Sequence, residues 1–227
     1  MSKATTEMTR WLAAELSRRG DPEIARGMAA YMKTDMPFHG VKKPERLPVL
    51  RELKKRYAPA DARAYEETVL ALWQGKHREE KYAALYMAMA FRKLIDLPAM
   101  PLYERLIREG AWWDLVDDVA IRLVGEVWRK QRARVSTLMD RWIDDEDLWI
   151  RRTAIIGQNK HGEDTDEKRL FDYCARRMHE KEFFIRKGIG WALRSYAYTA
   201  PKAVASFLRT HKDGLSGLSY REASKHL

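Results

Sequence analysis

The chain has 227 residues, of which 45% are hydrophobic, enough to bury the core of one large domain or of an extended repeat array. Its 43 Lys and Arg exceed its 33 Asp and Glu, and the formal net charge of +10 favours nucleic acid or another anionic surface as the partner. No apolar run is long enough for a transmembrane helix, no signal peptide is visible, and the only cysteine, Cys174, excludes an intrachain disulfide, so we expect a cytoplasmic protein.

Apolar residues recur at helical spacing along the whole chain, and no stretch alternates as a half-buried strand would. Asp21 precedes Pro22 as a cap residue precedes an N1 proline, and Ser219 and Glu222 have the spacing of a capping box. The pattern predicts an all-α fold with these helices: 4–18, 22–34, 44–57, 61–75, 78–93, 99–109, 112–129, 133–143, 147–159, 166–179, 182–197 and 201–210, with a short last turn near 219–227.

The later helices pair, and the pairs repeat. The segment Trp149–Arg152 recurs 35 residues later as Phe184–Lys187, and Trp113 lies 36 residues before Trp149. Two-helix units of this period are typical of HEAT or TPR arrays, in which the second helices of successive units line one curved surface. We therefore predict one domain over 1–227, an α-solenoid of HEAT-like two-helix repeats with a concave basic face.

Three of these second helices carry residues suited to a cation inside a polyanion. Trp113 and Asp117 are four residues apart and share one helix face, where an aromatic ring lies beside a fixed anion. A second stripe on a later helix holds Lys187, Trp191 and Arg194. If the helices are adjacent, they form an aromatic-lined notch with an anion at its centre and cations, Arg152 and Lys160 among them, on its flanks.

Each part of this notch has a purely structural alternative. Tryptophans at helix starts in repeat proteins usually pack between repeats, which suits Trp112 better than Trp113. Asp117 can equally be the partner of Arg152 in a structural salt bridge, and Arg151 can simply be solvated. Trp191 suits close helix packing as well as an exposed ring.

The sequence shows no sign of a cofactor. The six histidines have no metal-ligand spacing with Cys174 or with each other, and no phosphate-binding glycine loop, nucleophile elbow or zinc motif is present. We therefore expect neither a metal nor another cofactor.

Taken together, the motifs resemble those of the AlkD family of bacterial DNA glycosylases, which are built from HEAT-like repeats and remove alkylated purines. The resemblance covers nearly the whole chain and is carried by the following segments: Tyr31–Lys33, Phe38–Val41, Trp112–Asp117, Trp149–Arg152, Phe183–Lys187, Gly190–Arg194 and Leu218–Ala223.

The resemblance implies a role for each site residue. Trp113, Asp117 and Trp191 match the family's catalytic aromatic–carboxylate–aromatic set, and Arg152 matches its active-site arginine. Residues that border or contact the DNA backbone in the family match Tyr31, Lys160 and Arg194, to which the basic stripe adds Lys187.

On this resemblance we expect a monofunctional DNA glycosylase acting in base excision repair. Its partner would be duplex DNA with alkylated bases, and it would act as a monomer in the bacterial cytosol, without a metal or a membrane. Two other functions stay open: a DNA-structure binder without catalysis, and a protein-interaction scaffold. The Trp113, Asp117, Arg152 and Trp191 set argues against the scaffold, because a peptide groove does not need it.

Overall fold

The computed structural model describes residues 3–227, and this range contains helices but no strand, which confirms the predicted all-α class. The chain forms two compact units, the first ending at Ile95 and the second beginning at Asp96. Within the described range, no helix combines the length and the apolar character needed to cross a membrane. The single domain over 1–227 and the curved solenoid stay predictions.

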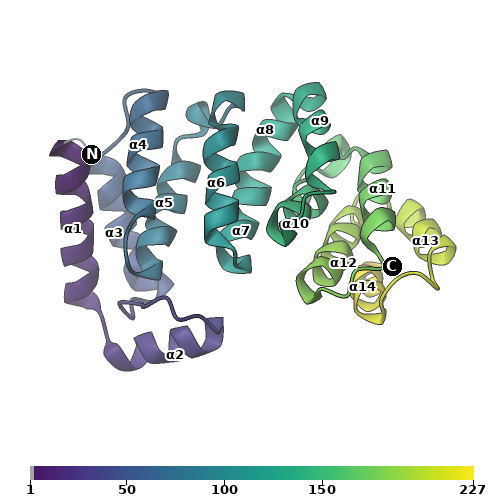
Figure 1. Ribbon diagram of the computed structural model, residues 1–227, viewed down its shortest axis with the longest axis horizontal. Coiled ribbons are helices and arrows are strands. Elements are labelled where there is room, and N and C mark those ends of the chain that lie inside the picture. The colour runs from purple at the N-terminus through teal and green to yellow at the C-terminus, as the bar shows by residue number, and fades with distance from the viewer. Residues whose placement is uncertain (1–2) are drawn as a thin grey trace. The chain divides into compact units, whose positions relative to one another are not determined.

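The first unit packs four long helices around a shared apolar core (Figure 1). Its elements are α1 (Lys3–Arg19), α2 (Pro22–Met32), α3 (Lys43–Arg56), α4 (Ala62–Trp73), α5 (Arg78–Ala90) and η1 (Arg92–Leu94). Helix α1 contacts α3, α4 and α5, and buries Leu12 and Leu16 against them. In contrast, α2 buries only Met32. The cap predicted at Asp21 is confirmed, because its carboxylate accepts hydrogen bonds from the backbone amides of Glu23 (2.8 Å) and Ile24 (3.1 Å).

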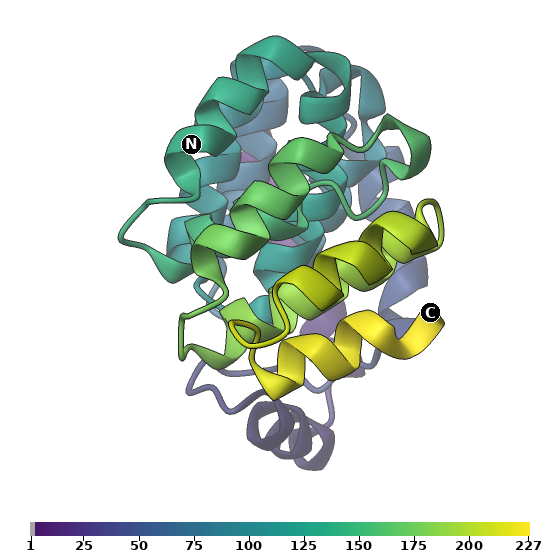
Figure 2. The ribbon, with the colours of Figure 1, turned by 90° about the vertical axis from the view of Figure 1, so that its right-hand side faces the viewer.

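The second unit is a series of shorter helices. Its elements are η2 (Leu97–Ala99), α6 (Met100–Gly110), α7 (Trp113–Asp118), η3 (Val119–Val124), α8 (Gly125–Lys130), α9 (Arg132–Trp142), α10 (Leu148–Ile156), η4 (Gly162–Asp164), α11 (Glu167–Arg177), α12 (Phe183–Ala197), α13 (Pro201–Thr210), α14 (Gly217–Ala223) and η5 (Ser224–His226). Figure 2 views this unit from the end at which α13 and α14, in yellow, follow α12.

Three helices of the second unit begin at a constant interval. Helices α7, α10 and α12 start at Trp113, Leu148 and Phe183, each 35 residues after the one before, and α10 contacts both α7 and α12. The fifth residues of these helices are Asp117, Arg152 and Lys187 in turn. The repeat therefore brings an anion and a cation to equivalent heights on neighbouring helices.

Two predicted local features, one uninterrupted helix and one capping box, are wrong. The helix expected over 112–129 is not one α-helix, because a π-helical segment, η3, separates α7 from α8. No glycine or proline lies within Val119–Val124, so the sequence of the segment gives no sign of the π-helical turn. The capping box expected at Ser219 is also absent: α14 is capped by Ser216, whose hydroxyl accepts a hydrogen bond from the Ser219 amide at 3.0 Å.

Close contact between α12 and α14 depends on Gly190. A Cβ atom there would lie 2.5 Å from the Cβ of Glu222 and 2.9 Å from the carbonyl oxygen of Ser219, closer than packed atoms approach. Since these contacts are backbone or near-backbone, neither helix can yield by a side-chain rotation alone.

We expect Gly190→Ala to lower the free energy of unfolding by about 1–3 kcal/mol through overpacking. The same change at Gly27, on α2, meets no atom within 4 Å and should instead stabilise the protein by about 0.4–1 kcal/mol, because alanine restricts the unfolded chain and favours helix. Urea denaturation of both variants measures the difference. Equal effects of the two substitutions would show that α12 and α14 do not depend on the missing side chain.

Candidate functional site

The centre of the site is an ion pair between α7 and α10. The Arg152 guanidinium donates from Nε to Asp117 Oδ1 and from Nη2 to Asp117 Oδ2, both at 2.8 Å. This bidentate geometry is the strongest form of a carboxylate–guanidinium contact. Arg152 is only 3% exposed, whereas the Asp117 side chain keeps 17% of its surface open. The pair therefore shows its anion, rather than its cation, to solvent.

Helix α12 completes the support of Arg152. The third donor, Nη1, bonds to the Phe184 carbonyl at 2.5 Å. A Cβ atom on Gly188 would lie 3.0 Å from the same nitrogen, so a glycine leaves room for the guanidinium against α12. With three of its N–H donors engaged and almost no exposed surface, Arg152 holds Asp117 in one orientation.

Burial raises the pKa of the Asp117 carboxyl above its ordinary value, although the hydrogen bonds and positive charge of Arg152 act in the opposite direction. Asp118 and Asp114 add smaller upward contributions. Arg152 therefore opposes the effect of burial and favours the ionised form of Asp117.

Aromatic rings lie on the same helices. Trp112, Trp149 and Phe184 form a cluster with ring centroids 4.8–6.1 Å apart, which is the packing role expected for Trp112. Trp113 and Trp191 are only half-buried. Trp113 lies one turn before Asp117 on α7, and Trp191 lies one turn beyond Gly188 on α12. Both tryptophans therefore belong to the helices that hold the ion pair, and both keep open ring surface.

The basic residues of α12 pair with a carboxylate of α14, Glu222, which the sequence places only in a capping box. Glu222 of α14 pairs with Lys187 at 2.8 Å and with Lys225 at 2.8 Å, and it also accepts a hydrogen bond from Arg194. The hydrogen bonds from Lys187 and Lys225 are the largest causes that lower the Glu222 pKa to about 2. The predicted DNA-binding cations Lys187 and Arg194 are thus held together by one shared anion.

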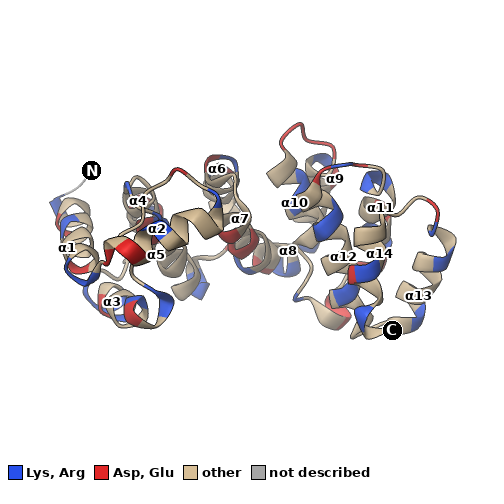
Figure 3. Ribbon diagram, turned by 90° about the horizontal axis from the view of Figure 1, so that it is seen from below, with Lys and Arg blue, Asp and Glu red and all other residues tan. Residues whose placement is uncertain are grey.

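The remaining predicted residues differ in their surroundings. Lys160 is exposed in the turn that follows α10, whereas Tyr31 is 77% exposed on α2 of the first unit. Arg151 is not simply solvated, because its guanidinium pairs with Glu180 through bonds of 3.1 and 3.0 Å. Figure 3 shows Lys and Arg positions recurring along the helices of the second unit from α10 onwards.

Sequence reasoning missed two supporting residues for different reasons. Gly188 could have been suspected, because it follows Lys187 by one position in the repeat that aligns Arg152 with Lys187. The sequence places Glu222 only in a capping box, and its pairing with α12 needs the close approach at Gly190, which no local pattern reveals.

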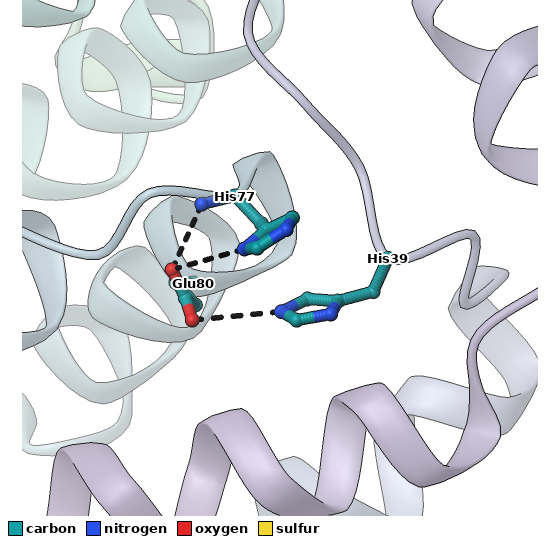
Figure 4. A group of neighbouring side chains, drawn as sticks. All are labelled: His39, His77 and Glu80. Carbon is teal, nitrogen blue, oxygen red and sulfur yellow. Dashed lines mark hydrogen bonds and ion pairs between the residues drawn. The ribbon is translucent and has the colours of Figure 1, made fainter. Parts of the chain in front are cut away.

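A second group of titratable side chains lies in the first unit. His39, His77 and Glu80 offer one ligand atom each, all within 4.8 Å of one another (Figure 4). The spacing of the histidines along the sequence did not reveal this cluster, because His39 lies in the loop before α3 and His77 caps α5.

Comparisons with known proteins agree with this architecture. A family model described as DNA alkylation repair enzyme matches residues 12–227. A solved structure titled as a predicted DNA alkylation repair enzyme from Enterococcus faecalis is 30% identical, with a TM-score of 0.84 over 92% of this chain and 97% of that one. A Streptococcus mutans crystal structure shares the fold at 16% identity, with a TM-score of 0.64 over 97% and 99% of the two chains. No curated protein matches the sequence.

Breaking the ion pair from the arginine side should destabilise the protein strongly. We expect Arg152→Met to lower the free energy of unfolding at neutral pH by about 3–5 kcal/mol, because it leaves the mostly buried Asp117 charge unpaired. Without Arg152 the Asp117 pKa rises further, so the folded state binds a proton more readily than the unfolded state. The stability of this variant should therefore recover as the pH falls from 7.5 towards 5.

The matched control is the double variant Asp117→Asn/Arg152→Met, which has no carboxylate to titrate at this position. It should recover part of the lost stability at pH 7.5 and lack the gain on acidification. Denaturation curves for both variants at pH 7.5 and pH 5 measure how the free energy of unfolding of each one changes with pH. The same pH response in the two variants would exclude Asp117 as its source.

Proposed function

Because the chain belongs to the DNA alkylation repair enzyme family, we propose that it is a monofunctional DNA glycosylase that hydrolyses the N-glycosidic bond of cationic alkylated purines in duplex DNA. The substrates would be of the N3-methyladenine and N7-methylguanine type, and the reaction would begin base excision repair. The observation that carries the proposal is the Asp117 carboxylate, fixed by Arg152 and open on one side, on helices that also carry half-buried tryptophans.

The charge of the substrate explains why such a site needs no proton donor. A purine alkylated at N3 or N7 is positively charged and leaves as a neutral base once the glycosidic bond breaks. Positive charge then moves to the deoxyribose, which passes through an oxocarbenium-like state as in glycoside hydrolysis generally. The task of the protein is to stabilise that cation and to supply a water molecule.

Asp117 suits both parts of this task. A carboxylate has about four acceptor positions, and Arg152 occupies one on each oxygen. The remaining positions can face the developing sugar cation and orient a water towards the anomeric carbon. Because the carboxylate is held before the substrate arrives, it stabilises the transition state without reorganising.

The tryptophans would recognise the cationic nucleotide. Ring faces attract cations by about 0.5–2 kcal/mol per contact, and the open surfaces of Trp113 and Trp191 are available for this purpose. Such contacts favour the charged lesion over a neutral purine, which adds selectivity at the binding step.

Arg152 would act as a positioning residue for Asp117, a role that its burial favours over direct contact with a phosphate. The DNA backbone would instead meet Lys160, Lys187 and Arg194, with Tyr31 contributing from the first unit. The exposure of Lys160 and the excess of positive charge support this assignment.

Two other functions make different demands on the same surface. A DNA binder without catalysis would use the cations but not the Asp117–Arg152 pair, and a protein-interaction scaffold would bind DNA with little dependence on salt. Release of N7-methylguanine from alkylated duplex DNA is the assay that separates the three, since only the glycosylase frees the base.

We expect Asp117→Asn to slow the release of N7-methylguanine by on the order of 100- to 1,000-fold, because the amide keeps the shape but loses the charge that stabilises the sugar cation. DNA affinity should change little. Single-turnover release and DNA binding, measured on the same preparation, test both statements.

A purely structural Asp117 predicts the reverse pattern. In that case Asp117→Asn would lower the melting temperature but keep its rate per folded molecule. Recording the melting temperature beside the single-turnover rate separates the two roles. A folded Asp117→Asn protein with a near-wild-type rate contradicts the proposed mechanism.

Binding to DNA should weaken steeply as salt is added and depend little on base sequence. Each phosphate contact that is lost should reduce the slope of log K against log salt by about one. We therefore expect Lys160→Ala to reduce the magnitude of this slope by about one. Lys160→Arg keeps the charge and should leave the slope unchanged. Identical slopes for wild type and Lys160→Ala would remove this residue from the DNA interface.

A further inference from the structure

The cluster in the first unit brings together two imidazole rings and a carboxylate. His39 lies in the loop between α2 and α3, His77 precedes the first residue of α5, and Glu80 lies in the first turn of that helix. The two rings stack with centroids 3.7 Å apart, and both present a nitrogen to the Glu80 carboxylate (Figure 4). Glu80 is buried, and both histidines are half-buried.

The distances within the cluster are long for hydrogen bonds but suitable for ligands of one metal ion. His39 Nε2 lies 3.5 Å from Glu80 Oε1, and His77 Nδ1 lies 3.9 Å from Glu80 Oε2. A strong N–H···O bond is about 2.7–3.2 Å long. Two ligands of a tetrahedral zinc ion, each about 2.0–2.1 Å from the metal, are separated by about 3.3–3.4 Å. The two spacings to Glu80 are close to this separation, and all three ligand atoms lie within 4.8 Å of one another.

The charges of the three groups also suit a cation. The two imidazole rings stack with their centroids 3.7 Å apart, so one cation can be shared by a lone pair from each ring. Glu80 supplies the negative charge, and its Oε2 is fixed by a 2.8 Å hydrogen bond from the His77 amide. The His77 side chain keeps 32% of its surface open, which leaves a route for an ion and for a water ligand.

The surrounding fold holds the ligands in place. The adjacent Glu79, fully buried, accepts hydrogen bonds from three successive backbone amides, those of His39 at 3.0 Å, Gly40 at 2.9 Å and Val41 at 3.1 Å. Gly40 has φ of +85°, a conformation that favours glycine, and it allows this turn. The loop that carries His39 is thereby tied to the start of α5 before any ion binds.

We infer that His39, His77 and Glu80 bind one divalent transition-metal ion, with zinc the best match. Two histidines and a glutamate form a known three-ligand set for zinc, in which water completes the coordination. The two imidazole ligands disfavour calcium and magnesium, which prefer oxygen ligands alone. This inference does not depend on the proposed glycosylase function.

A bound ion would join the loop before α3 to α5 inside the first unit. Because an ion that binds only the folded state stabilises it, zinc should raise the melting temperature in proportion to the logarithm of its concentration. The effect expected of the ion is therefore on the stability of the first unit, and it is independent of the chemistry proposed at Asp117.

The test uses the full chain, freed of metal with EDTA and carrying no histidine tag. Titration with Zn²⁺ should show one ion bound per chain, and Co²⁺ should produce the visible absorption of a four-coordinate nitrogen and oxygen site. The double variant His39→Ala/His77→Ala should bind Zn²⁺ at least about 100-fold more weakly, since losing two ligands exceeds the effect of losing outer-shell partners. The control variant His179→Ala removes an exposed histidine in the turn after α11, and it should bind Zn²⁺ as wild type does.

The variant Glu80→Gln tests the site independently, in case the double variant does not fold. Its amide oxygen can still accept the hydrogen bond from the His77 amide, so the helix start is preserved while the negative charge is lost. Weaker Zn²⁺ binding by a folded Glu80→Gln protein supports the site. Absence of Zn²⁺ binding by wild type, or equal binding by wild type and either folded cluster variant, overturns the inference.

Discussion

The buried pairing of Arg152 with Asp117 is the interaction on which the second unit depends. Arg152 is almost without exposed surface, and a buried charge without a partner costs about 3–5 kcal/mol. The whole protein is expected to be stable by only about 5–15 kcal/mol, so this one requirement constrains the register of three helices. Asp117 must lie opposite Arg152 on the neighbouring helix, and Gly188 must face the guanidinium. The same constraint leaves the carboxylate as the accessible member of the pair.

A second electrostatic arrangement governs the end of the unit. Glu222 gathers Lys187, Arg194 and Lys225, so three cations are brought together against one carboxylate. Without that anion, mutual repulsion would spread the cations apart. In the proposed complex with DNA, phosphates would therefore meet cations whose positions are already organised, and less side-chain freedom would be lost on binding.

The helices were largely predictable because their signals are local, as the Asp21 cap illustrates. The parts that were missed depend on contacts between distant residues. Nothing within Val119–Val124 marks the π segment, and the spacing of Ser219 and Glu222 predicts a cap at Ser219, whereas Ser216, three residues earlier, caps α14. In the site, the repeat period predicted that Asp117 and Arg152 would be neighbours, but periodicity could not show which of them is buried. His39 and His77 meet where hydrogen bonds to Glu79 hold a loop against α5, a tertiary contact without a periodic pattern.

The π segment between α7 and α8 has a consequence for the phase of these helices. An α-helix turns by about 100° with each residue, and a π-helical turn accommodates one residue more than an α-helical turn does. Residues after Val124 therefore point in directions different from those that an uninterrupted helix would give them. The segment allows Asp117 to face α10 while Trp128, two to three turns later, reaches the hydroxyl of Ser136 on α9 at 2.9 Å. The π segment therefore shifts the side-chain directions of α8 relative to those of α7 within one run of helical residues.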